Sequence, residues 1–295
     1  MAIVAVTGLA SLDFVFGLPE MPTCAEKYRA ETQVNVSGGG GANAAVAITR
    51  LGGDARYVTR LGQDATGDMI MDSLAGEGLD LSGIHRFPDG RSPCSSVLVD
   101  GNGERQIVNF RGAGLDPDPR WMNLAQPFDA ALADTRWFEG ALALMQAAAR
   151  RGVPAVLDAE APVQRELARA ASHVAFSEQG LRDFTSVSDA ESGLKLAAAE
   201  LGGWVAVTLG GDGVLIAGDD GLQHVPAFPV DVVDTLAAGD VWHGAFALRL
   251  GEGADEITAT TFANAAAALK CLRLGGRAAA PDRAETEAFM AERGA

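Results

Sequence analysis

Cysteine is scarce in this chain of 295 residues, and long apolar runs are absent. The three cysteines, Cys24, Cys94 and Cys271, are odd in number and widely separated, which argues against a disulfide framework and against a metal site. We therefore expect reduced thiols and a cytoplasmic protein. No apolar run reaches the roughly 18 residues that a membrane-spanning helix needs. The first ten residues have no basic segment ahead of their apolar stretch, so a first strand is expected there and not a signal peptide.

Positive charge is also in short supply. The chain has 23 lysines and arginines against 39 aspartates and glutamates, which gives a net charge of −16. This balance argues against nucleic acids and anionic membranes as partners. If the protein binds an anionic ligand, it must gather its few basic side chains locally. The length and the 48% content of hydrophobic residues fit a single domain over residues 1–295 with a sizeable core.

Strand-like and helix-like patterns alternate along most of the sequence. This alternation predicts βαβ units, a mainly parallel sheet, right-handed connections and helices on both faces. Ligands are then expected beyond the carboxyl ends of the strands. The predicted strands are residues 3–8, 55–62, 130–135, 153–160, 173–178 and 204–210, and the predicted helices are 42–51, 65–78, 138–151, 162–172 and 189–201.

Two stretches interrupt the alternation. Residues 15–36 are mixed and polar, with strand-like character over 27–36, and residues 94–110 look like a hairpin that turns at 101–103. Two such excursions from a parallel sheet predict a small β lid, with lid segments at about 15–36 and 92–112. Ordinary surface hairpins are the alternative.

The most informative segment is Asp-Thr-Leu-Ala-Ala-Gly-Asp at residues 234–240. It follows a β-type run at 225–233 and opens a helical run at 240–250, an arrangement that aims backbone N–H groups at a phosphate. A carboxylate at that place, Asp240, can accept a proton from an alcohol while the N–H groups hold a phosphoryl group. Simple capping of the helix by Asp240 is the alternative.

A second signal is the run of four glycines at 38–41, which precedes a small-residue helix that ends at Gly52 and Gly53. Alone, it fits a flexible loop ahead of a tightly packed helix. Together with the 234–240 segment, in this order and at this separation, it resembles the ribokinase-like (PfkB-type) carbohydrate kinase family over nearly the whole chain. The resemblance implies a three-layer α/β/α sandwich with a small β lid, ATP and Mg²⁺ as cofactors, and a homodimer through the lid.

The family resemblance also assigns roles to individual residues. Asp240 is expected to be the base, and the backbone N–H groups of Ala238, Gly239 and Asp240 are expected to form the anion hole. Ala237 stands where the family usually has glycine, and if this residue needs a positive φ, alanine costs on the order of 1 kcal/mol. Around the sugar, the resemblance places Asp13, Gly39, Gly40 and Asn43.

For the nucleotide, the loop at 208–213 resembles the family's phosphate loop, with a glycine-containing β-turn as the alternative. The candidate ATP contacts there are Thr208, Gly210 and Gly213. Asn264 matches a family position near the adenine, with a packing role as the alternative. The family's N-x-x-E motif, which organises Mg²⁺ through water, has no clean match, and Glu178 is the nearest candidate.

Several sequence blocks, among them EKYRAE, LADTRWFEGA and PAFPVDVVDT, resemble the branch of this family that phosphorylates 6-deoxy-6-sulfofructose. That resemblance assigns the sulfonate to Lys27, Asn109 and Arg136, and it implies phosphoryl transfer from ATP to the C1 hydroxyl in sulfoglycolysis. An ammonium, a guanidinium and an amide suit a tetrahedral anion. A phosphate would fit them equally well, and Arg111 would favour it. Each charge taken alone fits a solvated surface group.

Two alternatives stay open for the function. The first is the same chemistry on another sugar, such as ribose, 2-keto-3-deoxygluconate or a fructose phosphate. The second is a non-catalytic sensor of sugar or nucleotide built on the kinase fold. Ala237 and the missing N-x-x-E motif favour the sensor, whereas the intact Asp240 argues against it.

Overall fold

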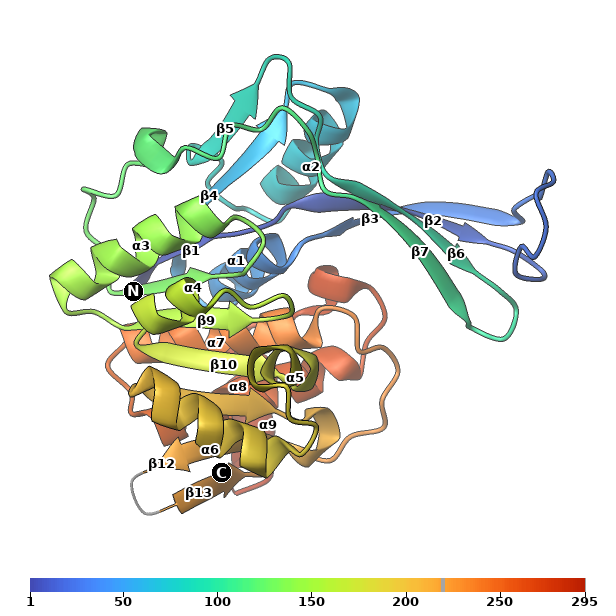
Figure 1. Cartoon of the computed structure of the whole chain (residues 1–295). Helices are drawn as coiled ribbons and strands as arrows, with labels where there is room; N and C mark the ends of the chain where they lie inside the picture. Colours follow the sequence, from blue (N-terminus) through green and yellow to red (C-terminus); the bar gives the residue numbers. More distant parts are fainter. Residues whose placement is uncertain (219–220, 295) are drawn as a thin grey trace.

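The computed structural model describes residues 1–218 and 221–294. Their strands form two sheets (Figure 1). The larger sheet has the strand order β13-β12-β11-β10-β9-β8-β1-β4-β5. The strands from β11 to β5 are parallel to their neighbours, and β12 is antiparallel to both β11 and β13. The strands of this sheet are β1 (Ile3–Thr7), β4 (Asp54–Gly62), β5 (Ile84–Phe87), β8 (Ala130–Ala133), β9 (Ala155–Ala159), β10 (His173–Ser177), β11 (Trp204–Thr208), β12 (Val214–Gly218) and β13 (Gly221–Val225).

Helices cover both faces of this sheet. Side chains alternate along each strand, so in β1 Val4 and Val6 belong to one buried cluster and Ala5 to the other. The first cluster includes α1 (Gly40–Arg50), α2 (Ala65–Gly76), α7 (Ala238–Gly251) and α8 (Glu256–Cys271), and the second includes α3 (Phe138–Arg151), α4 (Arg165–Ala170), α5 (Glu178–Thr185) and α6 (Ala190–Leu201). A last helix, α9 (Arg283–Ala291), packs on α8. The predicted three-layer α/β/α sandwich with a mainly parallel sheet is confirmed.

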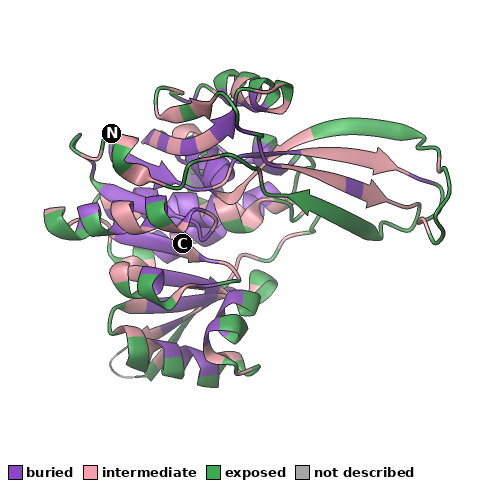
Figure 2. Cartoon of the chain, turned by 45° about the horizontal axis from the view of Figure 1, so that its top comes forward, coloured by how far each residue is buried: buried purple, intermediate pink, exposed green. Residues whose placement is uncertain are grey.

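The smaller sheet, here called the lid sheet, projects from the body of the molecule (Figure 1). Its strand order is β3-β2-β6-β7, and its strands are β2 (Ser11–Gly17), β3 (Thr32–Gly38), β6 (Cys94–Val99) and β7 (Arg105–Phe110). The predicted hairpin over 94–110 is confirmed as the antiparallel pair β6–β7. Strand β7 is exposed along its whole length, as is the outer part of β3 (Figure 2).

The prediction of a strand over residues 225–233 is wrong. Strand β13 ends at Val225, and residues 226–237 form neither helix nor strand. Pro226 and Pro229 lack the backbone N–H that a ladder needs, so the run cannot pair like an interior strand. The 234–240 segment therefore enters α7 from an irregular connection.

Cys24, Cys94 and Cys271 are all free thiols in the structure. For residues 1–218 and 221–294, no helix combines the length and the hydropathy that crossing a bilayer requires.

Candidate active site

The glycine run at 38–41 lies against the loop that follows β1. A Cβ on Gly39 would lie 2.2 Å from the carbonyl oxygen of Leu9, and one on Gly41 would lie 2.7 Å from the Cα of Gly8. Gly39 also has a φ of 98°, which side chains disfavour. The glycines therefore form a closely packed floor, and the alternative of a flexible loop does not hold.

Three carboxylates surround this floor at Gly40. An ideal Cβ on Gly40 would lie 3.3 Å from Oδ1 of Asp240, 3.5 Å from Oδ2 of Asp134 and 3.6 Å from Oδ2 of Asp158. Asp134 follows β8, Asp158 lies near the carboxyl end of β9, and Asp240 lies in the first turn of α7. Asp134 and Asp158 were missed in the sequence. A carboxylate at the carboxyl end of a buried apolar strand was the signal that would have indicated them.

Asp240 is held by α1 and does not cap its own helix. Nδ2 of Asn43 donates a hydrogen bond to Oδ2 of Asp240 at 2.7 Å, and the N-cap of α7 is Ala237. Burial raises the pKa of Asp240, and the bond from Asn43 and the nearby His243 offset part of this rise. Oδ1 of Asn43 is buried, and no described residue donates to it. The site thus holds a carboxylate with a raised pKa next to an acceptor that has no donor among the described residues.

The turn before α7 places Ala237 in the left-handed region, with a φ of 65°. Alanine in this position costs on the order of 1 kcal/mol relative to a residue with ordinary φ. The predicted anion hole needs one correction, because the N–H of Ala238 donates to the carbonyl oxygen of Thr235 at 3.1 Å. The N–H groups of Gly239 and Asp240 have no backbone acceptor in the described chain. Free donors in the first turn of a helix attract anions.

Asp134 ties together three backbone segments beneath the site. Its Oδ2 accepts hydrogen bonds from the N–H of Leu9 at 2.7 Å and of Gly41 at 3.1 Å, and its Oδ1 accepts one from the N–H of Arg136 at 2.9 Å. Burial raises the pKa of Asp134, and these three bonds offset part of the rise. The carboxylate thereby fixes the floor relative to the ends of β1 and β8.

Asp158 forms a buried contact with α7. Its Oδ1 lies 3.6 Å from Nε2 of His243, and Nδ1 of His243 lies 2.8 Å from the carbonyl oxygen of Gly239. Burial raises the pKa of Asp158 to about 6, with His243 lowering it and the charge of Asp240 raising it further. The raised value follows from several carboxylates sharing one enclosed space.

Asp158→Asn is expected to change how stability depends on pH. The pKa of Asp158 is about 6 in the folded protein and 3.8 when unperturbed. Because the folded value is higher, protonation favours folding below about pH 4, and this contribution is lost as the pH rises towards 6. Asparagine loses no proton, so its free energy of unfolding does not fall in this way. Relative to the wild type, the free energy of unfolding of the variant should therefore rise by up to about 3 kcal/mol between pH 4 and pH 7. Urea unfolding at both pH values measures this gain, and an equal difference at both would contradict it.

Asp13, Ser95 and Asn109 form a polar row across three strands of the lid sheet. The register pairs Asp13 with Ser95 and Ser95 with Asn109, and Oγ of Ser95 donates to Oδ1 of Asn109 at 2.8 Å. A Cβ on Gly38 would lie 3.2 Å from Oδ2 of Asp13, so this row borders the floor from the lid side. The structure thus brings the predicted residues Asp13 and Asn109 together. Ser95 was missed because its position depends on strand pairing.

Three arginines line a small cavity of about 30 Å³ next to the loop after β1: Arg60, Arg111 and Arg136. Nη1 of Arg136 donates to the carbonyl oxygen of Ala161 at 2.7 Å, and the guanidinium of Arg60 lies 4.5 Å from the ring centre of Trp137. Such a local gathering of positive charge is what an anion site in an acidic chain requires. Arg60 was missed because β4 brings it here from a distant part of the sequence.

Lys27 does not join these arginines. It is exposed in the loop between β2 and β3, at the far end of the lid sheet (Figure 1), whereas Arg136 follows β8 in the body. The predicted convergence of Lys27, Asn109 and Arg136 is therefore not met within this copy of the chain. The reason is that β2 and β3 extend away from the large sheet and carry their loop with them.

The loop at 208–213 follows β11 at its carboxyl end. Gly210 has a φ of 56°, is exposed, and has open space where a Cβ would lie. Gly213 is buried instead, and a Cβ there would lie 2.3 Å from the carbonyl oxygen of Val225. The structure gives Gly213 a packing role, which leaves Thr208 and Gly210 as the nucleotide candidates of this loop.

The side chain of Asn264 is fully engaged in packing. Its Oδ1 accepts from Nε1 of Trp242 at 2.8 Å, and its Nδ2 donates to the carbonyl oxygens of Val225 at 3.3 Å and Pro226 at 3.0 Å. These bonds join α7, α8 and the end of β13. The structure therefore supports the packing alternative for Asn264 in place of a side-chain contact with adenine.

Glu178 is the exposed first residue of α5, directly after β10. Asp158 and Glu160 lie at the end of the adjacent strand β9, so three carboxylates occur along the same edge of the sheet. Oxygen ligands of this kind suit Mg²⁺ held partly through water. In the described part of the chain, no three His, Cys, Asp or Glu side chains are grouped to bind a metal by themselves.

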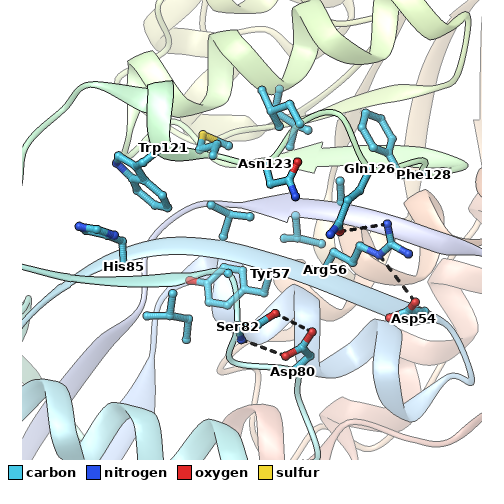
Figure 3. Close-up of a pocket in the computed structure, with 18 of the residues that line it drawn as sticks. Asp54, Arg56, Tyr57, Asp80, Ser82, His85, Trp121, Asn123, Gln126 and Phe128 are labelled. Carbon is cyan, nitrogen blue, oxygen red and sulfur yellow. Dashed lines mark hydrogen bonds and ion pairs between the residues drawn. The ribbon is translucent and has the colours of Figure 1, made fainter.

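A larger hollow of about 690 Å³ lies elsewhere (Figure 3). Its lining includes Asp54, the first residue of β4, and Phe128, just before β8, which places it at the amino ends of the strands. None of the predicted site residues lines it. Ligands of parallel sheets bind at the carboxyl ends, and Asp240, the glycine floor and the three arginines all lie there.

Comparison with known proteins shows the family to which the chain belongs. The sequence matches the pfkB family of carbohydrate kinases over residues 1–283. Ribokinase from Bacillus subtilis is 27% identical over 294 residues, which cover 97% of this chain and 99% of that protein. A putative ribokinase from Agrobacterium tumefaciens is 36% identical with a TM-score of 0.89, covering 99% of this chain and 98% of its own. Arabidopsis thaliana ribokinase, solved with ribose and ATP, is 25% identical with a TM-score of 0.89 and covers 98% of each chain.

The fold and the site define an ATP-dependent carbohydrate kinase. The chain belongs to the pfkB family, as its two glycine-containing motifs predicted. These relatives are named ribokinases, so they do not show a particular closeness to sulfofructose kinases.

Proposed function

We propose that this kinase phosphorylates the C1 hydroxyl of 6-deoxy-6-sulfofructose. The observation that carries the proposal is the cavity lined by Arg60, Arg111 and Arg136, close to the floor where Asp240 lies. A carboxylate base at one end and guanidinium groups at the other suit a sugar with a hydroxyl at one end and a tetrahedral anion at the other. The choice of sulfonate over phosphate rests on the sequence blocks that resemble sulfofructose kinases.

In the proposed reaction, Asp240 accepts the proton of the attacking hydroxyl as charge develops on it. The N–H groups of Gly239 and Asp240 hold the transferring phosphoryl group. Asn43 orients the carboxylate through its 2.7 Å hydrogen bond and offers its unpaired Oδ1 to a second sugar hydroxyl. Gly39, Gly40 and Asp13 contact the sugar from the floor and the lid.

For the nucleotide, we propose that the phosphates lie along Thr208 and Gly210. Mg²⁺ bound to the triphosphate would neutralise part of its charge. Glu178 would act on this ion through water, together with Asp158 and Glu160 at the end of the adjacent strand β9.

We also propose a homodimer formed through the lid sheet. Its outer strands expose four large apolar side chains, Val34, Ile107, Val108 and Phe110, and an exposed apolar patch of this kind marks an interaction surface. Lys27, at the far end of the lid sheet, would reach a sulfonate only after lid closure or from a second copy.

A neutral sugar such as ribose is the second candidate. Lys27 lies in the loop between β2 and β3 and does not line the arginine cavity, which favours ribose, and so do the names of the relatives. The same base and floor would serve ribose, since they recognise only hydroxyl groups.

The two candidates are separated by ADP release with Mg-ATP on a panel of acceptors: sulfofructose, fructose 6-phosphate, fructose, ribose and 2-keto-3-deoxygluconate. We expect sulfofructose to be preferred by about a hundredfold, equivalent to roughly 2.7 kcal/mol of transition-state discrimination. Arg136→Gln should lose most of this preference and leave turnover of neutral sugars within about threefold. Arg150→Gln, at an exposed position of α3, is the matched control. Equal losses on anionic and neutral sugars would refute the anion site.

A further inference from the structure

Lys270 is a fully buried lysine that contacts the segment before α7. It lies one residue before the end of α8 and has 0% exposure. Its Nζ donates to the carbonyl oxygen of Asp234 at 2.7 Å and to Oδ2 of the same residue at 2.9 Å. Lysine is rarely buried, because removing an ammonium from water is costly unless partners replace the lost hydration. Stability alone is a weak reason to retain such a pair, since apolar side chains often replace buried ion pairs without loss.

Asp234 is the centre of the network to which Lys270 belongs. Its Oδ1 accepts from the N–H of Leu236 at 2.9 Å, and its Oδ2 accepts from the N–H groups of Gly275 at 3.2 Å and Gly276 at 3.4 Å. Burial raises the pKa of Asp234, but these hydrogen bonds and the contact with Lys270 outweigh it and lower that pKa to about 2. The carboxylate is therefore ionised throughout the ordinary pH range, and the ammonium always has its counter-charge.

This network sets the position of the segment that leads to the base. The N–H groups of Val233 and Asp234 both donate to the carbonyl oxygen of Cys271, at 2.8 and 3.2 Å. The main chain and side chain at the end of α8 thus hold residues 233–234 from two sides. Three residues further on, Ala237 adopts its unfavourable positive φ, which the chain keeps only where the surroundings enforce it.

We propose that Lys270 is a positioning residue for phosphoryl transfer, acting through Asp234. Its ammonium is an internal cation that clamps residues 234–237, so that the carboxylate and N–H groups at the start of α7 meet the phosphoryl group. Lys270 touches neither sugar nor nucleotide in this scheme. The inference rests on the proposed role of Asp240 as the base, but it is independent of which sugar is the acceptor.

The test compares Lys270→Met with Lys195→Met, an exposed lysine on α6, using ADP release with Mg-ATP and the best acceptor. We expect kcat to fall about a hundredfold in Lys270→Met, the typical effect of misplacing catalytic groups by about 1 Å. KM for ATP and for sugar should change by less than about threefold. In Lys270→Ala, added propylammonium should raise kcat at least tenfold over its value without the amine. The amine can occupy the emptied space and donate to the same two oxygens of Asp234.

The double variant Lys270→Met, Asp234→Asn serves as the control for folding, because it leaves no unpaired charge in the protein interior. The proposal expects this variant to regain thermal stability without regaining kcat. A double variant, or a folded Lys270→Met, with kcat within threefold of the wild type would overturn it. An amine that restores stability but not kcat would also overturn it. A different experiment tests whether Asp240 is the base: if Asp240→Asn keeps its activity, that assignment fails, whatever the result for Lys270.

Discussion

Asp240→Asn is expected to lower kcat by about a thousandfold or more and to leave the fold intact. Asparagine has nearly the same shape and can still accept the hydrogen bond from Asn43 through its carbonyl oxygen. It cannot accept the proton of the attacking hydroxyl, and loss of a positioned base typically costs 10²–10⁴-fold. ADP release at saturating Mg-ATP and acceptor measures the loss, and thermal unfolding checks the fold.

Asp231→Asn is the matched control, because Asp231 is an exposed carboxylate in the irregular connection before the turn. It should keep full activity. If Asp240→Asn retained a tenth or more of the wild-type kcat, Asp240 would not be the base. Binding of ATP and sugar with no ADP release even in the wild-type protein would instead identify a sensor.

Asp134→Ala is expected to reduce the free energy of unfolding by about 3–5 kcal/mol. The substitution removes a buried acceptor of three backbone hydrogen bonds, from Leu9, Gly41 and Arg136. A buried donor left unpaired costs about 1–3 kcal/mol, and alanine supplies no replacement acceptor. Urea unfolding at pH 7 measures the change through the transition midpoint.

Asp129→Ala provides the comparison for this result. The carboxylate of Asp129 accepts one hydrogen bond, from the N–H of Ile3 at 2.8 Å, in an exposed position before β8. We expect a loss of about 1 kcal/mol or less. Similar small losses for both variants would show that Asp134 does not hold the site together.

The alternation of strands and helices could be predicted because each element carries its own periodic pattern. The strand-like run at 225–233 fails because Val and Phe at alternate positions suggest a strand, while Pro226 and Pro229 prevent the pairing that a strand requires. Likewise, the sequence shows that residues 94–110 form a hairpin but not that β6 pairs with β2, which lies some eighty residues earlier.

The candidate site could be predicted only where its residues lie within short motifs. Asp240 and the glycine run are such cases, and Asn43 lies one turn into the helix that the glycines open. Arg60 joins Arg136 through parallel pairing of β4, β1 and β8, which no local pattern specifies. The predicted convergence of Lys27 with Arg136 is not met, because the position of Lys27 depends on how far the β2–β3 hairpin extends, which the sequence does not show.

If Asn43 contacts the sugar as proposed, its unpaired Oδ1 links the stability of this kinase to its choice of acceptor. A buried acceptor without a donor makes the unliganded protein less stable than its packing alone would give. A sugar that supplies a hydroxyl at that point relieves this penalty as it binds. A deoxy analogue fills the same space but leaves the oxygen unsatisfied, so it is rejected more strongly than the loss of one contact would suggest. On this proposal, discrimination between hydroxyl patterns is built into the free protein before any substrate arrives.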